Sequence, residues 1–394
     1  MTISIWQANP NFKQQPVREV DVLVVGAGLV GCAAAYFFRQ AGREVVITEM
    51  RDIALGASGR NAGFMITGPD TYYHHAIERY GHESTRELWK LSERTHAIWR
   101  GFTEKDSSVS IEQSGSFLLA ESEDEALDLE ATARALQADG IPVIYHAHDP
   151  FNRGYYAAVE QPWDGAVQPY ELAQAVFRAS GAELVANNEL YAIEQTEPDC
   201  VTVYTHRVIF RARYVLLCTN AYSPRIDPYF IGKVIPTRGQ CLVTAPLPEP
   251  VMRGCGYSDY GYMYYRMTFD NRLLIGGGRK NYKALENDTT DDRTTPEVQG
   301  YLDAYLHKHF PDVAAHLAAH NLPIERRWAG IMGFSVDGLP LVGTLPGKPR
   351  VGFAVAFHGH GLALGAGTAE RAVEFLLNGT SPGIVDAARL EHTA

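Results

Sequence analysis

The sequence predicts an α/β fold in which a Rossmann-like dinucleotide-binding domain is joined to a second, α+β domain built on a mainly antiparallel sheet. Three observations support this prediction. An apolar strand, a glycine-rich turn, a helix of small residues and a second strand follow one another over residues 21–49. A strand, a glycine-rich turn and a helix recur at 352–377. Between these two units, short strand-like segments replace the regular alternation of strand and helix.

The first unit contains the pattern Gly26-x-Gly28-x-x-Gly31, and Glu49 ends the strand that follows the helix. Gly26 permits a tight turn, Gly28 lets the backbone approach a pyrophosphate, and Gly31 lets the helix pack closely on the sheet. Glu49 is placed to accept the two hydroxyls of an adenosine ribose. The free amides and positive dipole end of the helix face the pyrophosphate. The complete unit predicts a dinucleotide site rather than a purely structural glycine turn.

Residues 51–63, directly after the acid, are dense in small residues and hydrogen-bond donors. A plain nicotinamide dehydrogenase needs no such loop here, and a solvated polar loop is the alternative. The segment resembles flavoproteins of the D-amino-acid oxidase, glycine oxidase and sarcosine oxidase group, in which Gly-Ala-Ser-x-Arg-Asn-x-Gly begins a helix beside the flavin. This resemblance implies that FAD contacts Leu29, Val30, Met50, Arg51, Gly56, Ala57, Ser58, Arg60, Asn61, Ala62 and Gly63.

Three later segments fit the same group. Leu190 falls where a backbone amide of the relatives meets the adenine, although an ordinary turn explains residues 186–193 equally well. A strand ending at 218 brings backbone near the pyrophosphate, and the helix after residue 358 directs free amides at the flavin N1/C2=O edge. A second dinucleotide fingerprint at 359–361 is disfavoured, because no further strand and acid follow. The flavin contacts expected from these segments are Leu190, Thr219, Asn220, Ala221, Gly338, Pro340, His358, Gly359, His360, Gly361, Leu362 and Ala363.

The order of the expected elements predicts a discontinuous FAD-binding domain, formed by residues 1–80, 150–225 and 326–394, and a substrate domain formed by 81–149 and 226–325. A chain of 394 residues is long for a single core. Helices are expected at 84–102, 123–139, 169–179, 295–309 and 362–377. Strands are expected at 117–120, 182–186, 192–195, 201–205, 208–210, 214–218, 240–245, 261–267, 272–276 and 352–357.

Composition limits the partners. The net charge of −11 argues against nucleic acid, and no long uncharged apolar stretch predicts a membrane span. The N-terminus lacks a secretory signal, and five scattered cysteines without Cys-x-x-Cys spacing suit reduced thiols in the cytoplasm. We expect no metal site, since His74-His75 and His307-Lys308-His309 lack a carboxylate or cysteine partner at metal spacing. The sequence does not determine whether the protein forms a homo-oligomer.

The resemblance extends over nearly the whole chain and points most closely to the gamma-glutamylputrescine oxidase branch, through residues 5–10, 56–61, 264–278 and 328–330. It implies hydride transfer from an amine carbon to flavin N5, hydrolysis of the imine, and oxygen as the acceptor, because no pyridine-nucleotide fingerprint appears. The alternatives are an amino-acid oxidase or dehydrogenase of the glycine oxidase type, a flavin-bearing subunit that needs a partner, and a nicotinamide-dependent dehydrogenase or imine reductase.

The sequence departs from the group at two places, and these differences bear on the substrate and on how FAD is attached. Met332 stands where glycine oxidase-like enzymes have an arginine for the substrate carboxylate, so a primary or secondary amine, polyamine derivatives included, is favoured over a free α-amino acid. Arg266 is the substitute if a carboxylate is bound, although an arginine at the end of an aromatic strand more often has a structural role. No cysteine follows Cys255, so FAD should be held noncovalently. The residues expected around the reacting atoms are Trp328, Met332, Tyr264, Arg266 and His358.

Overall fold

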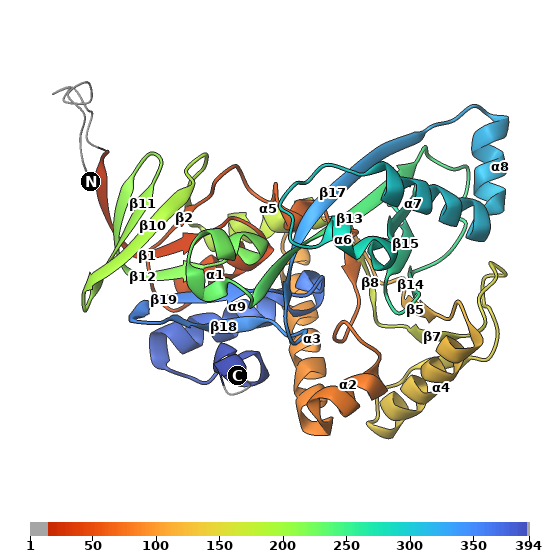
Figure 1. Cartoon of the computed structure of the whole chain (residues 1–394), viewed down its shortest axis with the longest axis horizontal. Helices are drawn as coiled ribbons and strands as arrows, with labels where there is room; N and C mark the ends of the chain where they lie inside the picture. The colour runs from red at the N-terminus through yellow and green to blue at the C-terminus, as the bar shows by residue number, and fades with distance from the viewer. Residues whose placement is uncertain (1–14, 392–394) are drawn as a thin grey trace.

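The computed structural model describes residues 15–391, which fold around two eight-stranded sheets and one three-stranded sheet (Figure 1). Five strands of the first sheet are parallel, in the order β9-β2-β1-β12-β19, and β10, β11 and β18 add antiparallel pairs. The strands are β1 (Val17–Val25), β2 (Val45–Thr48), β9 (Glu183–Val185), β10 (Leu190–Glu197), β11 (Cys200–Thr205), β12 (Ile209–Leu217), β18 (Leu341–Leu345) and β19 (Lys348–Val355).

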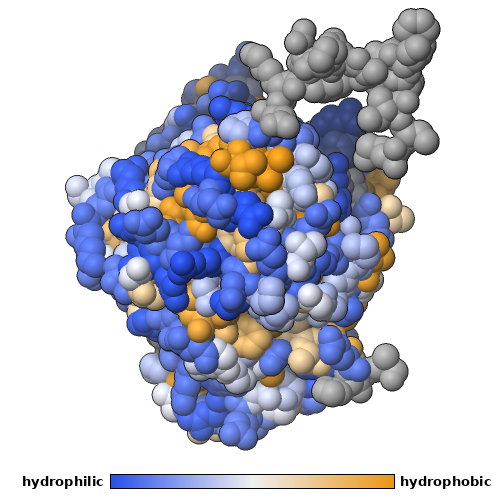
Figure 2. Space-filling model, turned by 90° about the vertical axis from the view of Figure 1, so that its left-hand side faces the viewer, coloured by the Kyte–Doolittle hydropathy of each residue, from blue (hydrophilic) through white to orange (hydrophobic). Residues whose placement is uncertain are grey.

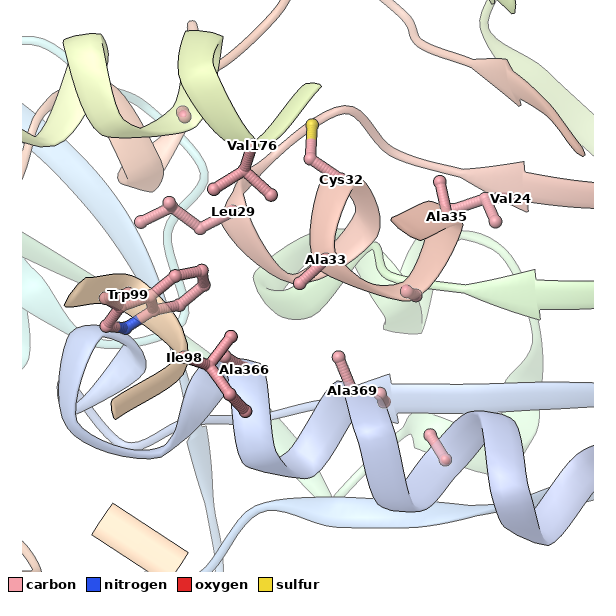
Figure 3. Close-up of a cluster of buried hydrophobic side chains, with 14 of the residues drawn as sticks. Val24, Leu29, Cys32, Ala33, Ala35, Ile98, Trp99, Val176, Ala366 and Ala369 are labelled. Atoms are coloured by element: carbon pink, nitrogen blue, oxygen red, sulfur yellow. The ribbon is translucent and has the colours of Figure 1, made fainter. Parts of the chain in front are cut away.

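Small residues let the helices pack closely beside this sheet. Figure 3 shows α1 between α5 and α9, with Trp99 of α3 inserted at one end of the cluster. A Cβ on Gly367 of α9 would lie 2.7 Å from the Leu91 side chain of α3, so the glycine sets the distance between these two helices. The helices are α1 (Leu29–Gln40), α3 (His82–Thr103), α5 (Pro169–Ser180) and α9 (Gly361–Asn378).

The second sheet has the order β17-β13-β16-β15-β14-β5-β7-β6 and is antiparallel except where β14 meets β5. Its strands are β5 (Ser116–Leu119), β6 (Ile144–His146), β7 (Ala158–Gln161), β13 (Val234–Thr244), β14 (Cys255–Ser258), β15 (Met263–Met267), β16 (Leu273–Gly277) and β17 (Ile324–Ser335). The helices α2 (Tyr73–Tyr80), α4 (Glu123–Ala138), α6 (Lys283–Glu286), α7 (Pro296–His309) and α8 (Pro311–Ala319) complete this half.

A small sheet, β3-β8-β4, is formed by β3 (Phe64–Met65), β8 (Gly165–Val167) and β4 (Ile111–Glu112). The predicted fold class is confirmed. The predicted domain boundaries stay predictions. The packing does show which sheet is contacted by α3 and which by β17, two elements that begin near predicted boundaries. Helix α3 contributes Leu91, Ile98 and Trp99 to the cluster beside the first sheet, and β17 pairs along its length with β13 in the second.

Strand β17 was not predicted from the sequence. Gly330 and Gly333 lie within it, and glycine weakens strand propensity, so the segment reads as a turn. Both glycines have a packing reason. A Cβ on Gly330 would lie 3.2 Å from the Arg60 side chain, and a Cβ on Gly333 would lie 2.5 Å from Asn220 Oδ1. Long-range pairing with β13 therefore overrides local propensity.

The end of the molecule at the left of Figure 1 is mostly hydrophilic, with hydrophobic residues in a few separate patches (Figure 2). Within residues 15–391, no helix combines the length and apolar character needed to cross a bilayer. The segment 5–10, which carries part of the predicted resemblance, lies outside the described residues.

Candidate active site and cofactor cavity

A cavity of about 470 Å³ is lined by residues of both large sheets. At one end it meets the carboxyl ends of β1, β2 and β12, which is where ligands bind in parallel sheets. At the other end it meets β13, β15, β16 and β17. Most residues predicted to hold FAD line it: Gly26, Gly28, Leu29, Val30, Glu49, Met50, Arg51, Gly56, Ala57, Ser58, Arg60, Asn61, Ala62, Leu190, Thr219, Asn220, Ala221, His358, Gly359, His360, Gly361, Leu362 and Ala363.

The glycine-rich turn between β1 and α1 forms a cradle that side chains would fill. Gly26 has φ +106°, which L-residues with a Cβ rarely adopt, and a Cβ there would lie 2.8 Å from the Cys218 carbonyl oxygen. A Cβ on Gly31 would lie 1.9 Å from the Gly26 carbonyl oxygen. Gly31 does not line the cavity, and its absent side chain is what lets α1 begin so close to the strand.

The carboxylate of Glu49 is fixed by backbone amides at the end of β2. Its Oε2 accepts a hydrogen bond from Ala27 N at 2.8 Å, and its Oε1 accepts one from Arg51 N at 2.9 Å. Each carboxylate oxygen has a further lone pair. Because Glu49 also lines the cavity, it remains available to ribose hydroxyls. Leu190, Tyr191 and His206 line the same end, and the rings of the latter two are stacked at 5.9 Å.

The loop at 56–63 is held by contacts from both halves of the chain. The Ser58 hydroxyl accepts a hydrogen bond from Leu29 N at 2.9 Å. Trp328 Nε1 donates to the Arg60 carbonyl at 2.8 Å, and Arg60 donates to the Ala329 carbonyl at 2.9 Å. Arg60 also forms an ion pair with Asp292 at 2.9 Å. Trp328 therefore lies behind the cofactor loop and does not line the cavity.

The turn before α9 is strained and well supported. Ala356 and His358 have φ values of 63° and 51°, in a region costly for residues with a Cβ. Asn220 Oδ1 accepts a hydrogen bond from Ala356 N at 3.0 Å, and His358 N donates to the Gly333 carbonyl at 2.9 Å. Residues 359–363 carry the N-terminal amides of α9 along the cavity wall, which places the positive end of the helix dipole there.

Aromatic side chains and a methionine line the other end of the cavity. Phe64, Tyr257 and Tyr264 meet edge to face, with ring centroids 5.3 to 6.1 Å apart. Burial, followed by the neighbouring Cys241, raises the pKa of Tyr264 well above its usual value. Met332 reaches toward Gly239, where a Cβ would lie 2.8 Å from its methyl carbon. Met332 and Tyr264 thus face the same space.

A carboxylate and two imidazoles face each other in this part of the cavity. Asp70 lies 3.4 Å from His358 Nε2 and 3.6 Å from His360 Nδ1. Burial lowers the pKa of His358 to about 4, against a smaller opposing effect of Asp70. His358 is therefore neutral at physiological pH, and its buried Nδ1 has no hydrogen-bond partner among the described residues. Asp70 had no sequence signal, because helix α2, which follows it, was not expected from the sequence.

The half-buried guanidinium of Arg279 also lines the cavity and was missed in the sequence. It lies 4.6 Å from the ring centroids of both Tyr262 and Phe334. Over residues 15–391 it has these ring contacts but no hydrogen bond or ion pair to a carboxylate. An arginine after a glycine run reads as a turn residue, so only the fold shows that it points into the cavity.

The remaining predicted residues lie away from the cavity lining. Arg266 is 4% exposed, lies 5.0 Å from the Phe269 ring centroid and reaches the Gly63 carbonyl at 3.5 Å. Burial lowers its pKa. Gly63, Gly338 and Pro340 also lie outside the lining, and Gly338 packs against the Tyr80 hydroxyl.

One step in the metal argument was wrong. His74 and His75 do have a carboxylate partner, because α4 brings Asp128 to 3.5 and 3.6 Å from their Nε2 atoms. Helix α3 and strands β4 and β5 separate these residues in the sequence, so spacing along the chain could not show the contact.

The two-sheet fold and a cavity that joins a dinucleotide cradle to an aromatic chamber define a flavin-dependent oxidoreductase. Residues 21–375 match the DAO family, described as FAD dependent oxidoreductase, and the chain belongs to this family. Its cofactor is FAD, as predicted, and the predicted resemblance is confirmed.

Two relatives and one solved structure show how far the similarity extends. The chain is 26% identical over 384 residues to "Probable oxidoreductase OrdL" of Haemophilus influenzae, covering 90% of this chain and 83% of that protein. It is 25% identical over 389 residues to "Gamma-glutamylputrescine oxidoreductase" of Escherichia coli, covering 94% and 87%. The crystal structure of glycine oxidase from Geobacillus kaustophilus superposes with a TM-score of 0.77 at 22% identity, covering 92% and 96% of the two chains.

Proposed function

We propose that the protein is an oxidase acting on the carbon–nitrogen bond of a primary or secondary amine that also carries a carboxylate or another anionic group. The observation that supports this most is Arg279, whose guanidinium lines the cavity without a carboxylate partner among the described residues. A guanidinium binds carboxylates through two parallel hydrogen bonds. The arginine therefore completes its hydrogen bonds with an anion brought by the substrate.

The similar proteins support both halves of this proposal. The Escherichia coli relative is named for gamma-glutamylputrescine, a conjugate with an amine at one end and an α-carboxylate at the other. Polyamine derivatives of this kind combine a reacting amine with a remote anion. A small α-amino acid, as the name glycine oxidase implies for the structural neighbour, is the alternative substrate.

The chemistry that FAD supplies when bound is acceptance of a hydride from the carbon beside nitrogen, with return of the electrons to an acceptor, here proposed to be oxygen. A secondary amine, water and oxygen then give an aldehyde, a primary amine and hydrogen peroxide. The protein's own residues have three tasks in this reaction. They bind the anion, remove a proton from the ammonium group and exclude water.

Proton removal is assigned to the group formed by Asp70 and His358. An ammonium ion has no free lone pair, so it must lose a proton before the neighbouring carbon gives up a hydride. His358 lines the cavity with an uncharged imidazole, but the burial that lowers its pKa to about 4 makes it a weak base, so it takes up the proton only with the support of Asp70. Asp70, at 3.4 Å from its Nε2, stabilises the protonated imidazole, whereas its attraction for the ammonium ion serves binding and not proton loss.

Phe64, Tyr257 and Tyr264 form the wall that excludes water, and Met332 fills the space between that wall and the turn before α9. Aromatic faces also bind the apolar stem or the cation of an amine. A methionine cannot form a charged forked contact, so the anion should be held at Arg279, away from Met332.

The cysteines support noncovalent binding of FAD and a place in the cytoplasm. All five are free thiols. Burial raises the pKa of Cys241, which lines the cavity, to about 12, and it raises that of Cys218 as well. Protonated thiols are poor nucleophiles, so neither should become attached to the flavin.

The test is a peroxide-release assay on the FAD-loaded protein with pairs of amines that differ only in a remote carboxylate. We expect kcat/KM to be higher for the carboxylated member, and Arg279→Gln to lower it about 100-fold for that member alone. Lys280→Gln is the matched control, because Lys280 is the adjacent cation, pairs with Asp259 and does not line the cavity.

Each contrary result has a defined meaning. A preference for the uncharged amine would remove Arg279 from the proposal and leave the simple amine oxidase. A preference for the α-amino acid would replace it with an amino-acid oxidase. Reduction of the flavin without peroxide release would remove oxygen as the acceptor. No reduction by any compound would favour a subunit that needs a partner.

A further inference from the structure

A group of metal-ligating side chains lies outside the cavity, where the N-terminal half of α2 meets α4. Asp128 Oδ1 lies 3.5 Å from His74 Nε2 and 3.6 Å from His75 Nε2. One ligand atom from each of the three residues lies within 4.8 Å of the other two. The two imidazole ring centroids are 3.9 Å apart.

These distances suit a shared ion better than direct hydrogen bonds. Hydrogen bonds between nitrogen and oxygen are usually shorter than about 3.2 Å. A tetrahedral zinc ion with bonds of about 2.1 Å places neighbouring ligand atoms about 3.4 Å apart. The separations of 3.5 and 3.6 Å between nitrogen and oxygen are close to that edge length.

Outer hydrogen bonds orient two of the three ligands. His74 Nδ1 lies 2.8 Å from the Thr132 hydroxyl, and with the proton on Nδ1 the lone pair of Nε2 faces Asp128. The Tyr260 hydroxyl donates to Asp128 Oδ2 at 2.8 Å, which leaves Oδ1 facing the imidazoles. Such contacts fix the tautomer and direction of ligands in known metal sites.

We propose that His74, His75 and Asp128 bind one Zn²⁺ ion, with water as the fourth ligand. Two imidazole nitrogens and one carboxylate favour zinc over Mg²⁺ or Ca²⁺, which take oxygen ligands. The ligand side chains are 17%, 36% and 29% exposed in the order named, so the ion can enter from solvent. The site is separate from the FAD cavity.

The bound ion joins parts of the chain that support the substrate end of the cavity. Asp70 lies just before α2, and Gly261 follows Tyr260, and both line the cavity. Glu125 of α4 already connects these segments, because its Oε1 accepts hydrogen bonds from the Tyr72 hydroxyl and from Tyr260 N, each at 2.6 Å. Zinc adds a second link beside this one and should raise the stability of this region.

The experiment is equilibrium dialysis of the FAD-loaded, chelator-treated protein against ZnCl₂, with metal measured by atomic emission. We expect one zinc per chain and a higher melting temperature in zinc. His75→Ala and Asp128→Asn should each weaken binding at least about 100-fold, and Tyr260→Phe, which removes only an outer hydrogen bond, about 10-fold. MgCl₂ should not compete.

His316→Ala is the matched control, since it breaks another histidine pair, His316 of α8 and His320 just after that helix, whose ring centroids are 4.4 Å apart. It should leave the zinc stoichiometry unchanged. Loss of zinc in this variant but not in His75→Ala would overturn the proposal. The absence of any zinc binding by the unmodified protein would also overturn it and would leave the three residues as two ordinary ion pairs.

Discussion

The cavity is built from backbone at one end and from side chains at the other. At the carboxyl ends of the strands of the first sheet, the glycine turn and the amides that hold Glu49 come largely from residues 25–63, a short stretch of chain. At the second sheet, the lining comes from Asp70, Tyr257, Arg279, Met332 and His358, which are far apart in the sequence. Binding of a dinucleotide needs a fixed backbone shape, whereas recognition of an amine depends on which side chains converge. We therefore expect side-chain atoms added at the first end to weaken FAD binding. We expect changes of charge at the second end to alter the activity toward amines.

The sharpest test of this difference is Gly31→Ala. The new Cβ would lie 1.9 Å from the Gly26 carbonyl oxygen, which belongs to the backbone and cannot move aside. We expect a loss of about 3 kcal/mol in the free energy of unfolding, together with loss of FAD, measured by denaturant unfolding and flavin absorbance.

Substitutions at two other glycines serve as comparisons for Gly31→Ala. Gly101→Ala, where a Cβ would meet nothing within 4 Å in α3, should stabilise the protein by about 0.5 kcal/mol. Gly28→Ala would place a Cβ 2.8 Å from the Ser58 hydroxyl, and rotation of that hydroxyl would relieve the contact but give up the hydrogen bond from Leu29 N, so the fold should survive while FAD affinity falls. Full FAD occupancy in Gly28→Ala would show that the turn is not the phosphate cradle.

The substrate end should make stability depend on pH. The pKa of His358 is about 4 in the folded protein, below its ordinary value of 6.5, because of burial. Between these values the unfolded chain binds a proton that the folded protein does not, so stability is complete above about pH 6.5 and falls as the pH drops toward 4. The groups that act on this imidazole are Asp70, His360, Arg279 and Arg79.

We expect His358→Asn to reduce that loss by on the order of 2 kcal/mol, measured as the free energy of unfolding at pH 7 and pH 4.5 with saturating FAD. Asparagine suits the positive φ of this position. Part of the dependence of stability on pH should remain in the variant, because burial also lowers the pKa of His96, to about 3. An unchanged slope in the variant would mean that His358 is already solvated.

The smallest effect is expected where the two ends meet. Trp328→Phe removes the 2.8 Å hydrogen bond to the Arg60 carbonyl, worth about 1 kcal/mol, so the Kd for FAD should rise about 5-fold. Trp163→Phe loses a comparable bond to the Thr67 hydroxyl and serves as the control, with no change in FAD affinity. Equal effects of the two substitutions would show that Trp328 does not support the cofactor loop.

The sequence was informative where function depends on local backbone. The unit from Gly26 to Glu49 predicted its own strand, turn and helix, because those residue types are needed within one short segment. Arg279 and Asp70 carried no such signal, since their importance arises only when β16 and α2 meet the turn at His358. Trp328 and Arg266 were noticed for their chemistry, but one lies behind the cofactor loop and the other is buried against Phe269. Side-chain direction across β17 and β15 is a product of long-range pairing, which spacing along the chain does not encode.

The order of strands in the first sheet also governs when the cavity can appear during synthesis. Strand β1 pairs with β12, and β12 pairs with β19, so the central strands come from the two ends and the middle of the described chain. The wall formed by residues 357–363 follows β19 and is made after every other strand. A nascent chain on the ribosome therefore has the glycine turn long before it has a complete pocket. Capture of FAD must wait until translation has passed residue 363, and until then the unpaired strand edges of the half-built parallel sheet are exposed to aggregation.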